Sequence, residues 1–241
     1  RITNWDAFDD KDDEDDAKVD QMVRIIQYLK TLPVKVVTLD KVEADDIIAY
    51  LSDVTPQKKE DKVFIVSSDK DFLQLINENV IVYRPMEKEY YTVDTVVEKF
   101  KMSPNNFILY KTLMGDNSDK VAGIKGLGEK KLYKLFPELT TQEMTLEDIY
   151  NISVKRLKEN VIYARVIQNF ASLETNYKIM DLSKPMIDKN DENYLDGVVK
   201  SKDIHYLPDQ FVSMYNTDQL GGIIRNVEHW VKDCFESLQI K

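Results

Sequence analysis

Three short motifs in the first half of the sequence place acidic side chains at close spacing. Together they contribute seven carboxylates, which are Glu43, Asp45, Asp46, Asp69, Asp71, Asp116 and Asp119. Two carboxylates about 4–5 Å apart repel each other by roughly 3–4 kcal/mol at an effective dielectric constant of 20. A pocket that gathered them would therefore need a cation or raised pKa values. Because the ligands are all oxygens, and His205 and His229 lie far along the chain, such a pocket suits Mg²⁺ or Mn²⁺ rather than zinc.

Each acidic motif taken alone also has a structural explanation. Asp40 and Glu43 fit a capping box, and acids are favoured in the first turn of a helix. Ser67 and Ser68 fit helix N-caps that precede Asp69 and Asp71. The third motif, residues 115–119, fits a polar turn. The sequence leaves these alternatives open for each motif, and the metal-binding interpretation rests on the three motifs converging.

A glycine-rich turn follows the third motif directly. Gly123, Gly126 and Gly128 lie between two predicted helices, and this spacing lets backbone N–H groups approach a phosphate. Further phosphate contacts would come from three basic residues, which are Lys125, Lys130 and Lys131. The alternative is a simple turn that joins two helices.

The elements that must position these motifs change in type along the chain. Apolar patterns predict strands at residues 34–39, 62–66, 80–84 and 89–92. A helix is predicted before the first strand, at 19–32, and two more between later strands, at 43–54 and 71–76. Strands that alternate with helices indicate a parallel or mixed sheet. The first two acidic motifs follow predicted strands, and ligands bind at the carboxyl ends of strands in open α/β sheets.

The second half of the sequence is predicted to be helical. Helices are expected at residues 104–114, 129–136, 154–177 and 218–238. We therefore predict an α/β half at residues 1–102 and a helical half at 103–241, with a helix-hairpin-helix at about 113–136. Residues 1–18 are strongly acidic and are predicted to be mobile.

Composition narrows the class of protein. The 241 residues carry a net charge of −10, which by itself disfavours a nucleic-acid binder, but five lysines fall between Lys120 and Lys134 with one acid. No apolar run approaches the ~20 residues that span a bilayer, so no membrane association is expected. The single cysteine, Cys234, excludes an intrachain disulfide and indicates a reducing compartment, so a cytoplasmic location is expected.

The three acidic motifs and the glycine turn, in this order, resemble the 5′ nuclease family over about residues 20–180. That family includes flap endonucleases, the 5′-exonuclease domain of bacterial DNA polymerase I and phage enzymes such as the T-even ribonuclease H. The resemblance implies a PIN-like α/β core, a parallel or mixed sheet flanked by helices, followed by a helical helix-hairpin-helix region. It also implies a structure-specific 5′→3′ exonuclease or flap endonuclease, and a phage origin would place it in the host cytoplasm.

The resemblance assigns roles to the acids. Glu43, Asp45 and Asp46 would serve one divalent ion, Asp116 and Asp119 a second, and Asp69 and Asp71 would lie between the two. Two-metal cleavage of a phosphodiester uses one ion to activate water and both to stabilise the transition state. The glycine turn would hold K⁺ and contact a duplex phosphate. The implied partners of this monomer are branched or 5′-ended duplex DNA, RNA–DNA hybrids and replication proteins.

The sequence departs from the family pattern upstream of Val34. Two further metal-site aspartates of the family have no counterpart there, and the arch region, usually cationic, is acidic at residues 9–16. An N-terminal truncation is therefore expected, and with it weak or absent activity of this polypeptide by itself. The family also usually has Asn at Lys120 and Pro at Ala122.

Two other classes of protein compete with this interpretation. The first is a non-catalytic helix-hairpin-helix DNA-binding protein derived from the family, although drift would remove buried carboxylates early because they are costly to keep. The second is a toxin-type metal-dependent ribonuclease, which the length of the chain and the turn from Gly123 to Gly128 disfavour.

Overall fold

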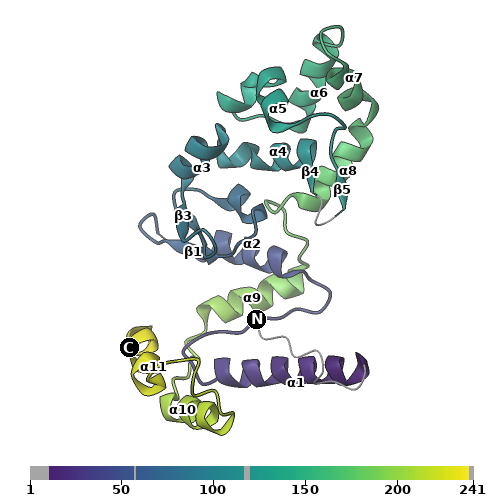
Figure 1. The fold of residues 1–241 in the computed structure, drawn as a ribbon. Coiled ribbons are helices and arrows are strands. Elements are labelled where there is room, and N and C mark those ends of the chain that lie inside the picture. The colour runs from purple at the N-terminus through teal and green to yellow at the C-terminus, as the bar shows by residue number, and fades with distance from the viewer. Residues whose placement is uncertain (1–10, 57, 117–119, 239–241) are drawn as a thin grey trace. The chain divides into compact units, whose positions relative to one another are not determined.

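The computed structural model describes residues 11–56, 58–116 and 120–238, with side chains described from residue 13 onward. The chain divides into two compact units. The central unit comprises residues 40–199, and the terminal unit combines the two ends of the chain, residues 11–39 and 200–238 as described. The predicted boundary at residue 102 falls inside the central unit, so a functional division there stays a prediction. Figure 1 labels the elements of both units.

A three-stranded mixed sheet begins the central unit. Strand β1 (Val63–Val66) pairs in parallel with β2 (Val80–Arg84), starting from Val63 opposite Val80. Strand β3 (Glu89–Tyr91) pairs with β2 in the antiparallel direction. The α/β class, the mixed sheet and the predicted strands at 62–66, 80–84 and 89–92 are therefore confirmed, since β-branched residues in short runs favour a pleated, half-buried surface.

Helices cover the inner face of this sheet. They are α2 (Ala44–Val54), the 3-10 segment η2 (Asp71–Leu75), α3 (Val93–Phe100), the 3-10 segment η3 (Pro104–Asn106) and α4 (Phe107–Met114). Leu73, Val82 and Val96 are fully buried in the core that these elements share with the sheet. Burial of a Val or Leu side chain contributes about 1.5–3 kcal/mol each, which holds η2 against the strands and fixes the loop that precedes it.

The rest of the central unit is helical apart from one small ribbon. Strand β4 (Gly115–Asp116) pairs with β5 (Val121–Ala122), and α5 (Glu129–Leu135), the 3-10 segment η4 (Pro137–Thr140), α6 (Leu146–Lys155), α7 (Val161–Gln168), α8 (Phe170–Met180) and α9 (Lys189–Lys200) follow. A second core forms here around Leu113, Leu132 and Phe136, which are fully buried. Helix α4 contributes Leu109 and Leu113 to this core and Phe107 to the first.

The single long helix predicted at residues 154–177 is wrong. The segment contains the end of α6, all of α7 and most of α8. The Asn160 side chain accepts a hydrogen bond from the Ile162 N–H at 3.0 Å and so begins α7 with a new N-cap. The apolar spacing continued across this break because α6 and α7 bury residues such as Ile149 and Ile162 in the same core.

The terminal unit is built from α1 (Lys11–Leu29), α10 (Pro208–Thr217), α11 (Val227–Phe235) and the 3-10 segment η5 (Glu236–Leu238). Leu32, Phe211, Tyr215 and Val231 form its buried core. The predicted mobile segment at residues 1–18 is wrong from Lys11 onward, where a helix begins. Residues 1–10 lie outside the described residues.

Two other predictions in the terminal unit are wrong. Residues 34–39 form no strand in the described structure, because a strand needs a partner for its backbone groups, and Val36 is 42% exposed. The tail helix predicted from residue 218 begins only at Val227, since Gly221 and Gly222 favour turns and Asn226 supplies the N-cap. Among the described residues no helix is long and apolar enough to cross a membrane.

Candidate active site

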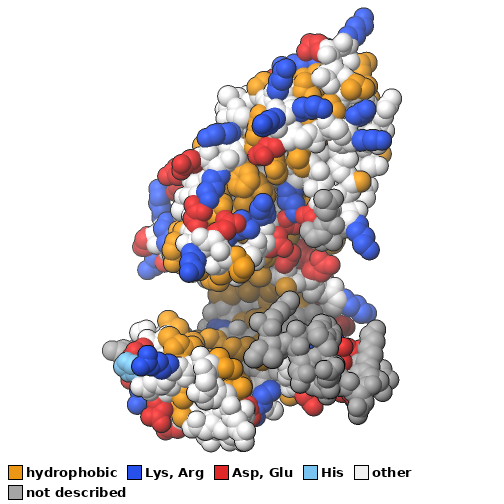
Figure 2. Space-filling model, viewed as in Figure 1, with side chains coloured by type: hydrophobic (Ala, Val, Ile, Leu, Met, Phe, Trp, Pro, Cys, Tyr) orange, Lys and Arg blue, Asp and Glu red, His pale blue; other side chains and the backbone are white. Residues whose placement is uncertain are grey.

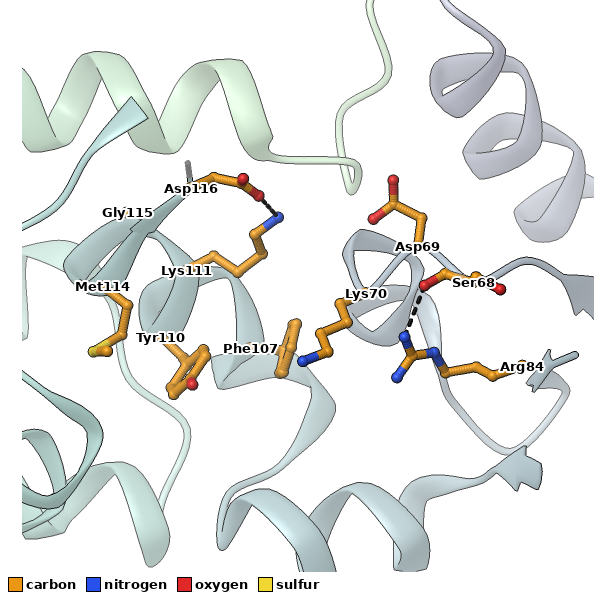
Figure 3. Close-up of a pocket in the computed structure, with 10 residues that line it drawn as sticks. All are labelled: Ser68, Asp69, Lys70, Arg84, Phe107, Tyr110, Lys111, Met114, Gly115 and Asp116. Carbon is orange, nitrogen blue, oxygen red and sulfur yellow. Dashed lines mark hydrogen bonds and ion pairs between the residues drawn. The ribbon is translucent and has the colours of Figure 1, made fainter. Parts of the chain in front are cut away.

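A pocket of about 580 Å³ lies where β1, β2 and α4 end (Figure 3). Its lining comes from the loop after β1, the last residue of β2, one side of α4 and the start of β4, namely Ser68, Asp69, Lys70, Arg84, Phe107, Tyr110, Lys111, Met114, Gly115 and Asp116. We name it the carboxylate pocket. Its position at the carboxyl ends of two parallel strands is where open α/β sheets bind ligands.

The second and third acidic motifs meet at this pocket through one lysine. The ammonium group of Lys111 forms ion pairs with Asp71 and with Asp116, the latter at 2.5 Å. Its side chain is only 9% exposed, and those of Asp71 and Asp116 are 14% and 15% exposed. A lysine is rarely buried to this extent without a partner. The fold therefore places one positive charge between two carboxylates that would otherwise repel each other.

Asp69 lies on the rim of the carboxylate pocket, between two turns of its own loop. Its backbone N–H donates to the Ser67 hydroxyl at 3.1 Å, and its Oδ1 accepts the Asp71 N–H at 2.9 Å. Figure 3 shows the Asp69 carboxylate directed away from Lys70 and Arg84. The expected serine N-cap is not formed, because the N-cap of η2 is Lys70 and no side chain caps it. The loop instead presents an exposed carboxylate beside Lys111 and Asp116.

The first acidic motif lies at the start of α2 and does not line the carboxylate pocket. Glu43 is the N-cap of α2, but its side chain makes no capping bond, so the expected capping box with Asp40 is not formed. Asp46 is 9% exposed, and its Oδ1 accepts the Met186 N–H at 2.9 Å. Asp45 is half-buried. Asp46 therefore ties α2 to the segment after α8, a role that the sequence did not predict.

Convergence of all seven acids stays a prediction. Asp119 lies outside the described residues. Within the described ranges no three carboxylate, histidine or cysteine side chains lie close enough to hold one metal ion. Of the predicted ligands, Asp69 and Asp116 line the carboxylate pocket, and Asp71 and Asp116 share the Lys111 ammonium. Their all-oxygen donor set fits Mg²⁺ or Mn²⁺, and the bridging ammonium of Lys111 marks a position where a cation is favourable.

Two glycines attach the third motif to the glycine turn. A Cβ on Gly115 would lie 2.3 Å from the Gly123 nitrogen, and a Cβ on Gly123 would lie 2.2 Å from the Met114 carbonyl carbon. Gly115 also has a φ of 78°, which favours glycine. The two backbones therefore touch where β4 and β5 pair, and Ile124 N–H donates to Leu113 O at 2.8 Å. Asp116 is held at a fixed place relative to the turn.

The turn from Gly123 to Gly128, which we name the glycine hairpin, anchors its apolar side and exposes its polar side. Ile124 and Leu127 are buried in the second core, whereas Lys125, Gly126, Gly128, Lys130 and Lys131 are exposed. Gly126 has a φ of 81°, and a Cβ there would lie 2.8 Å from Arg165 Nη1. A Cβ on Gly128 would meet nothing within 4 Å, so the open space beside Gly128 is available to a ligand.

Two cations hold the shape of the glycine hairpin. Arg165 of α7 donates to the Lys125 carbonyl at 2.5 Å, and Lys131 of α5 donates to the Gly126 carbonyl at 2.9 Å. Exposed Lys125 and Lys130 extend from the same surface. Figure 2 shows many Lys and Arg side chains over the helices of the central unit. The positive character of this region is local, in a chain whose net charge is −10.

The sequence reasoning did not predict Lys111 or Arg84. Lys111 lies five residues before Asp116, near the end of a helix, where a buried lysine has no sequence signature of its own. Arg84 ends a strand whose residues alternate between buried and half-buried, so its position in the pattern indicated an inward side chain. The signal available for Lys111 was a cation in the predicted helix that directly precedes the third acidic motif, and for Arg84 a cation at the carboxyl end of a predicted strand.

Comparisons with known proteins find relatives with nuclease and polymerase names. A family model described as the 5′-3′ exonuclease N-terminal resolvase-like domain matches residues 10–101. A 5′-3′ exonuclease of Aquifex aeolicus is 40% identical over 128 residues, which cover 53% of this chain and 44% of the relative. DNA polymerase I of Bacillus subtilis is 36% identical over 146 residues, covering 59% of this chain and 16% of that protein. The chain spans less than half the length of these curated relatives.

Solved structures of phage T5 proteins have the same fold. The T5 5′-exonuclease with bound zinc matches with a TM-score of 0.57 and 19% identity, over 94% of this chain and 72% of that chain. The T5 flap endonuclease in a complex with DNA and metal ions matches with a TM-score of 0.52 and 20% identity, over 76% and 62% of the two chains. At these identities the likeness concerns the fold.

Proposed function

We propose that this chain is a member of the 5′ nuclease family, on its similarity to 5′-3′ exonucleases, and that it cleaves phosphodiesters of 5′-ended or branched duplex DNA with two divalent ions. The observation that carries the proposal is the buried ammonium of Lys111, which Asp71 and Asp116 share at the carboxylate pocket that Asp69 and Asp116 line. Carboxylates of two separate motifs are held together at one end of the sheet, where their charge attracts a cation.

The proposed metal is Mg²⁺ or Mn²⁺, because the donors are oxygens. Asp69, Asp71 and Asp116 are the residues that we propose as its first ligands, with Asp119, Glu43, Asp45 and Asp46 completing two sites. When bound, the ions would activate water and stabilise the charge of the transition state. Asp71 and Asp116 would then bind the metal in place of the Lys111 ammonium. The ammonium would remain in the pocket, beside the proposed position of the reacting phosphate.

The glycine hairpin is the proposed contact to duplex DNA. Its exposed cations, Lys125 and Lys130, would neutralise backbone phosphates, and Gly128 leaves room for the backbone to approach. We also propose K⁺ at carbonyls of this hairpin other than those of Lys125 and Gly126, which already accept hydrogen bonds. RNA–DNA hybrids, replication proteins as partners, a monomeric state and a cytoplasmic location belong to the same proposal.

One variant separates this function from the non-catalytic alternative. Asp69→Asn removes a negative charge at the exposed rim of the carboxylate pocket and leaves the glycine hairpin unchanged. We expect the full-length protein carrying it to lose cleavage of a 5′-flap duplex in Mg²⁺ while it binds the same duplex with unchanged affinity. The melting temperature of the unsubstituted chain should rise with Mg²⁺, because the ion binds only the folded state. Equal cleavage by the variant and the unsubstituted protein would contradict the proposal.

A further inference from the structure

The end of the carboxylate pocket away from Asp116 is cationic. Lys70 and Arg84 both line it, and Figure 3 shows the Lys70 ammonium and the Arg84 guanidinium directed into the same space below the loop that carries Asp69. Lys70 is exposed, and no ion pair to it occurs within the part of the chain that the structure describes. The pocket therefore has two chemically different ends, one that suits a metal cation and one that suits an anion.

Arg84 is held rigidly in this position. One Nη donates to the Ser68 carbonyl at 2.7 Å, and the other pairs with Glu87 at 2.6 Å. The guanidinium also lies over the Tyr91 ring, with Cζ 5.5 Å from the ring centroid. Its side chain is 8% exposed. An arginine fixed on two sides in this way loses little conformational entropy when a third group binds to it.

The polar atoms of Arg84 are not all satisfied. Its buried Nε has no hydrogen-bond partner in the structure. Leaving a buried donor unpaired costs more than an ordinary hydrogen bond contributes, so the position of Arg84 is fixed by its other contacts and not by this nitrogen. Glu87 offsets part of the arginine charge, and the Tyr91 hydroxyl and Arg84 together lower the pKa of Glu87 from its usual value. Lys70 also lies near enough to Glu87 to lower that pKa, so two cations at this end of the pocket face one carboxylate.

The geometry points to a second phosphate subsite formed by Lys70 and Arg84, for the phosphodiester next to the one that is cleaved on the same strand. The inference rests on the proposed function and adds a substrate contact to it. Guanidinium and ammonium groups together favour an anionic phosphate over a neutral ligand. A pocket of about 580 Å³ is in the range that holds a nucleotide-sized ligand, so one strand segment fits across both ends.

This subsite would orient the strand. With the reacting phosphate at the acidic end and its neighbour at Lys70 and Arg84, the strand crosses the pocket in one direction. Holding a substrate in one geometry is itself a large source of catalysis. A purely structural Arg84, which only ties β2 to the loop after β1, would explain its bonds to Ser68 and Glu87 but gives no role to Lys70.

A phosphate subsite and a purely structural role of Arg84 predict different salt dependences of DNA binding. Each phosphate contact adds about 0.7 to the slope of log affinity against log salt for a single strand. We propose Lys70→Met, Arg84→Met and, as matched control, Lys59→Met, which removes an exposed lysine before the opposite end of β1. Binding of the full chain to a fluorescent 5′-flap duplex in EDTA is measured by anisotropy over a series of KCl concentrations.

We expect Lys70→Met and Arg84→Met each to weaken binding about tenfold and to lower the salt slope by about 0.7. Lys59→Met should keep the salt slope of the unsubstituted chain. If Arg84→Met melts before it can be assayed, Lys70→Met decides alone, since Lys70 is exposed. An unchanged slope and affinity for Lys70→Met overturns the subsite. If the subsite is overturned and Asp69→Asn still abolishes cleavage, the proposed nuclease function stands without the subsite. If the unsubstituted full-length protein fails to bind or cleave the flap, both the subsite and the proposed function are overturned.

Discussion

In the carboxylate pocket, Asp71, Asp116 and Lys111 are largely buried and are matched to one another, whereas the lysines of the glycine hairpin face water. Charges in the pocket act at short range in a low dielectric, so each one has a large effect. Charges on the hairpin are screened by salt and act together. From this comparison we predict that cleavage depends on individual residues of the pocket, while DNA affinity depends on the backbone shape and summed charge of the hairpin.

The largest effect is expected from Asp116→Asn. Removing one buried carboxylate from the proposed metal site should lower the cleavage rate of the full-length protein by at least about 10²-fold, the scale of losing one preorganised electrostatic group. Duplex affinity should stay within about twofold, since the hairpin lysines are untouched. Glu174→Gln, an exposed acid on α8, is the control. Rapid cleavage by Asp116→Asn would remove the distinction between the two regions.

Lys111→Met should make the pocket depend on added metal. The substitution leaves Asp71 and Asp116 buried without their cation, and breaking a buried pair costs about 3–5 kcal/mol. Thermal or urea unfolding in EDTA should show that loss, and Mg²⁺ should restore more stability than it adds to the unsubstituted chain. Lys178→Met on the exposed face of α8 should change stability by no more than about 0.5 kcal/mol. Equal stability of both variants would contradict the pairing.

Gly126→Val tests whether the backbone shape of the hairpin carries binding. Valine at a φ of 81° is strained, and its Cβ would press on Arg165, at a cost of about 1–3 kcal/mol. We expect about tenfold weaker binding of duplex DNA, measured by anisotropy, at nearly full helical content by circular dichroism. Gly197→Ala, in α9 with open space around it, should leave binding unchanged. Intact binding by Gly126→Val would show that DNA contacts another surface.

Lys130→Met should have a smaller effect that depends on salt. The loss of one phosphate contact to duplex DNA lowers the slope of log affinity against log salt by about 0.9. Affinity should therefore differ from that of the unsubstituted chain at low salt and converge at high salt. Lys59→Met serves again as the control. A loss of DNA affinity that is equal at all salt concentrations would contradict the prediction that Lys130 acts through its charge alone.

The smallest effect concerns the ion pair between Arg24 and Asp218 in the terminal unit, an intermediate case between pocket and hairpin. Hydrogen bonds from Arg24 and Tyr28 lower the pKa of Asp218. A lowered folded-state pKa gives stability that is present above the ordinary aspartate pKa of about 3.9 and is lost as the pH falls through the folded value. Melting temperatures from pH 6 down to acid should therefore fall less steeply for Asp218→Asn. A steeper fall for the variant would exclude this pair as a source.

The sequence predicted the strands of the central unit because their patterns are local. Val80 and Val82 alternate with less buried neighbours, and this period identifies a strand without knowledge of its partners. The same reasoning failed at residues 34–39, where a β-branched run has no strand beside it in the described chain. It also failed at Asn160, because a cap residue inside a continuous apolar period leaves that period unchanged.

The candidate site was predictable only where acids cluster along the chain. Asp69, Asp71 and Asp116 could be singled out because they follow or begin predicted elements, and in the structure Asp69 and Asp116 line one pocket while Asp71 reaches Asp116 through Lys111. The roles of Lys111 and Arg84 depend on which helix packs against which strand. The hydrogen bond of Asp46 to Met186, which lie 140 residues apart, also depends on that packing. Such contacts follow from the tertiary fold and leave no pattern in a single sequence.

The contact between Gly115 and Gly123 has a consequence for where a nuclease of the proposed kind would cut. Because the two backbones touch, Asp116 and the glycine hairpin cannot move independently. A grip on the duplex at the hairpin and a reaction at Asp116 would then be separated by a constant length, so the protein would act as a ruler. A substitution that forces the two backbones apart, such as Gly123→Val, should abolish the uniform length of the product.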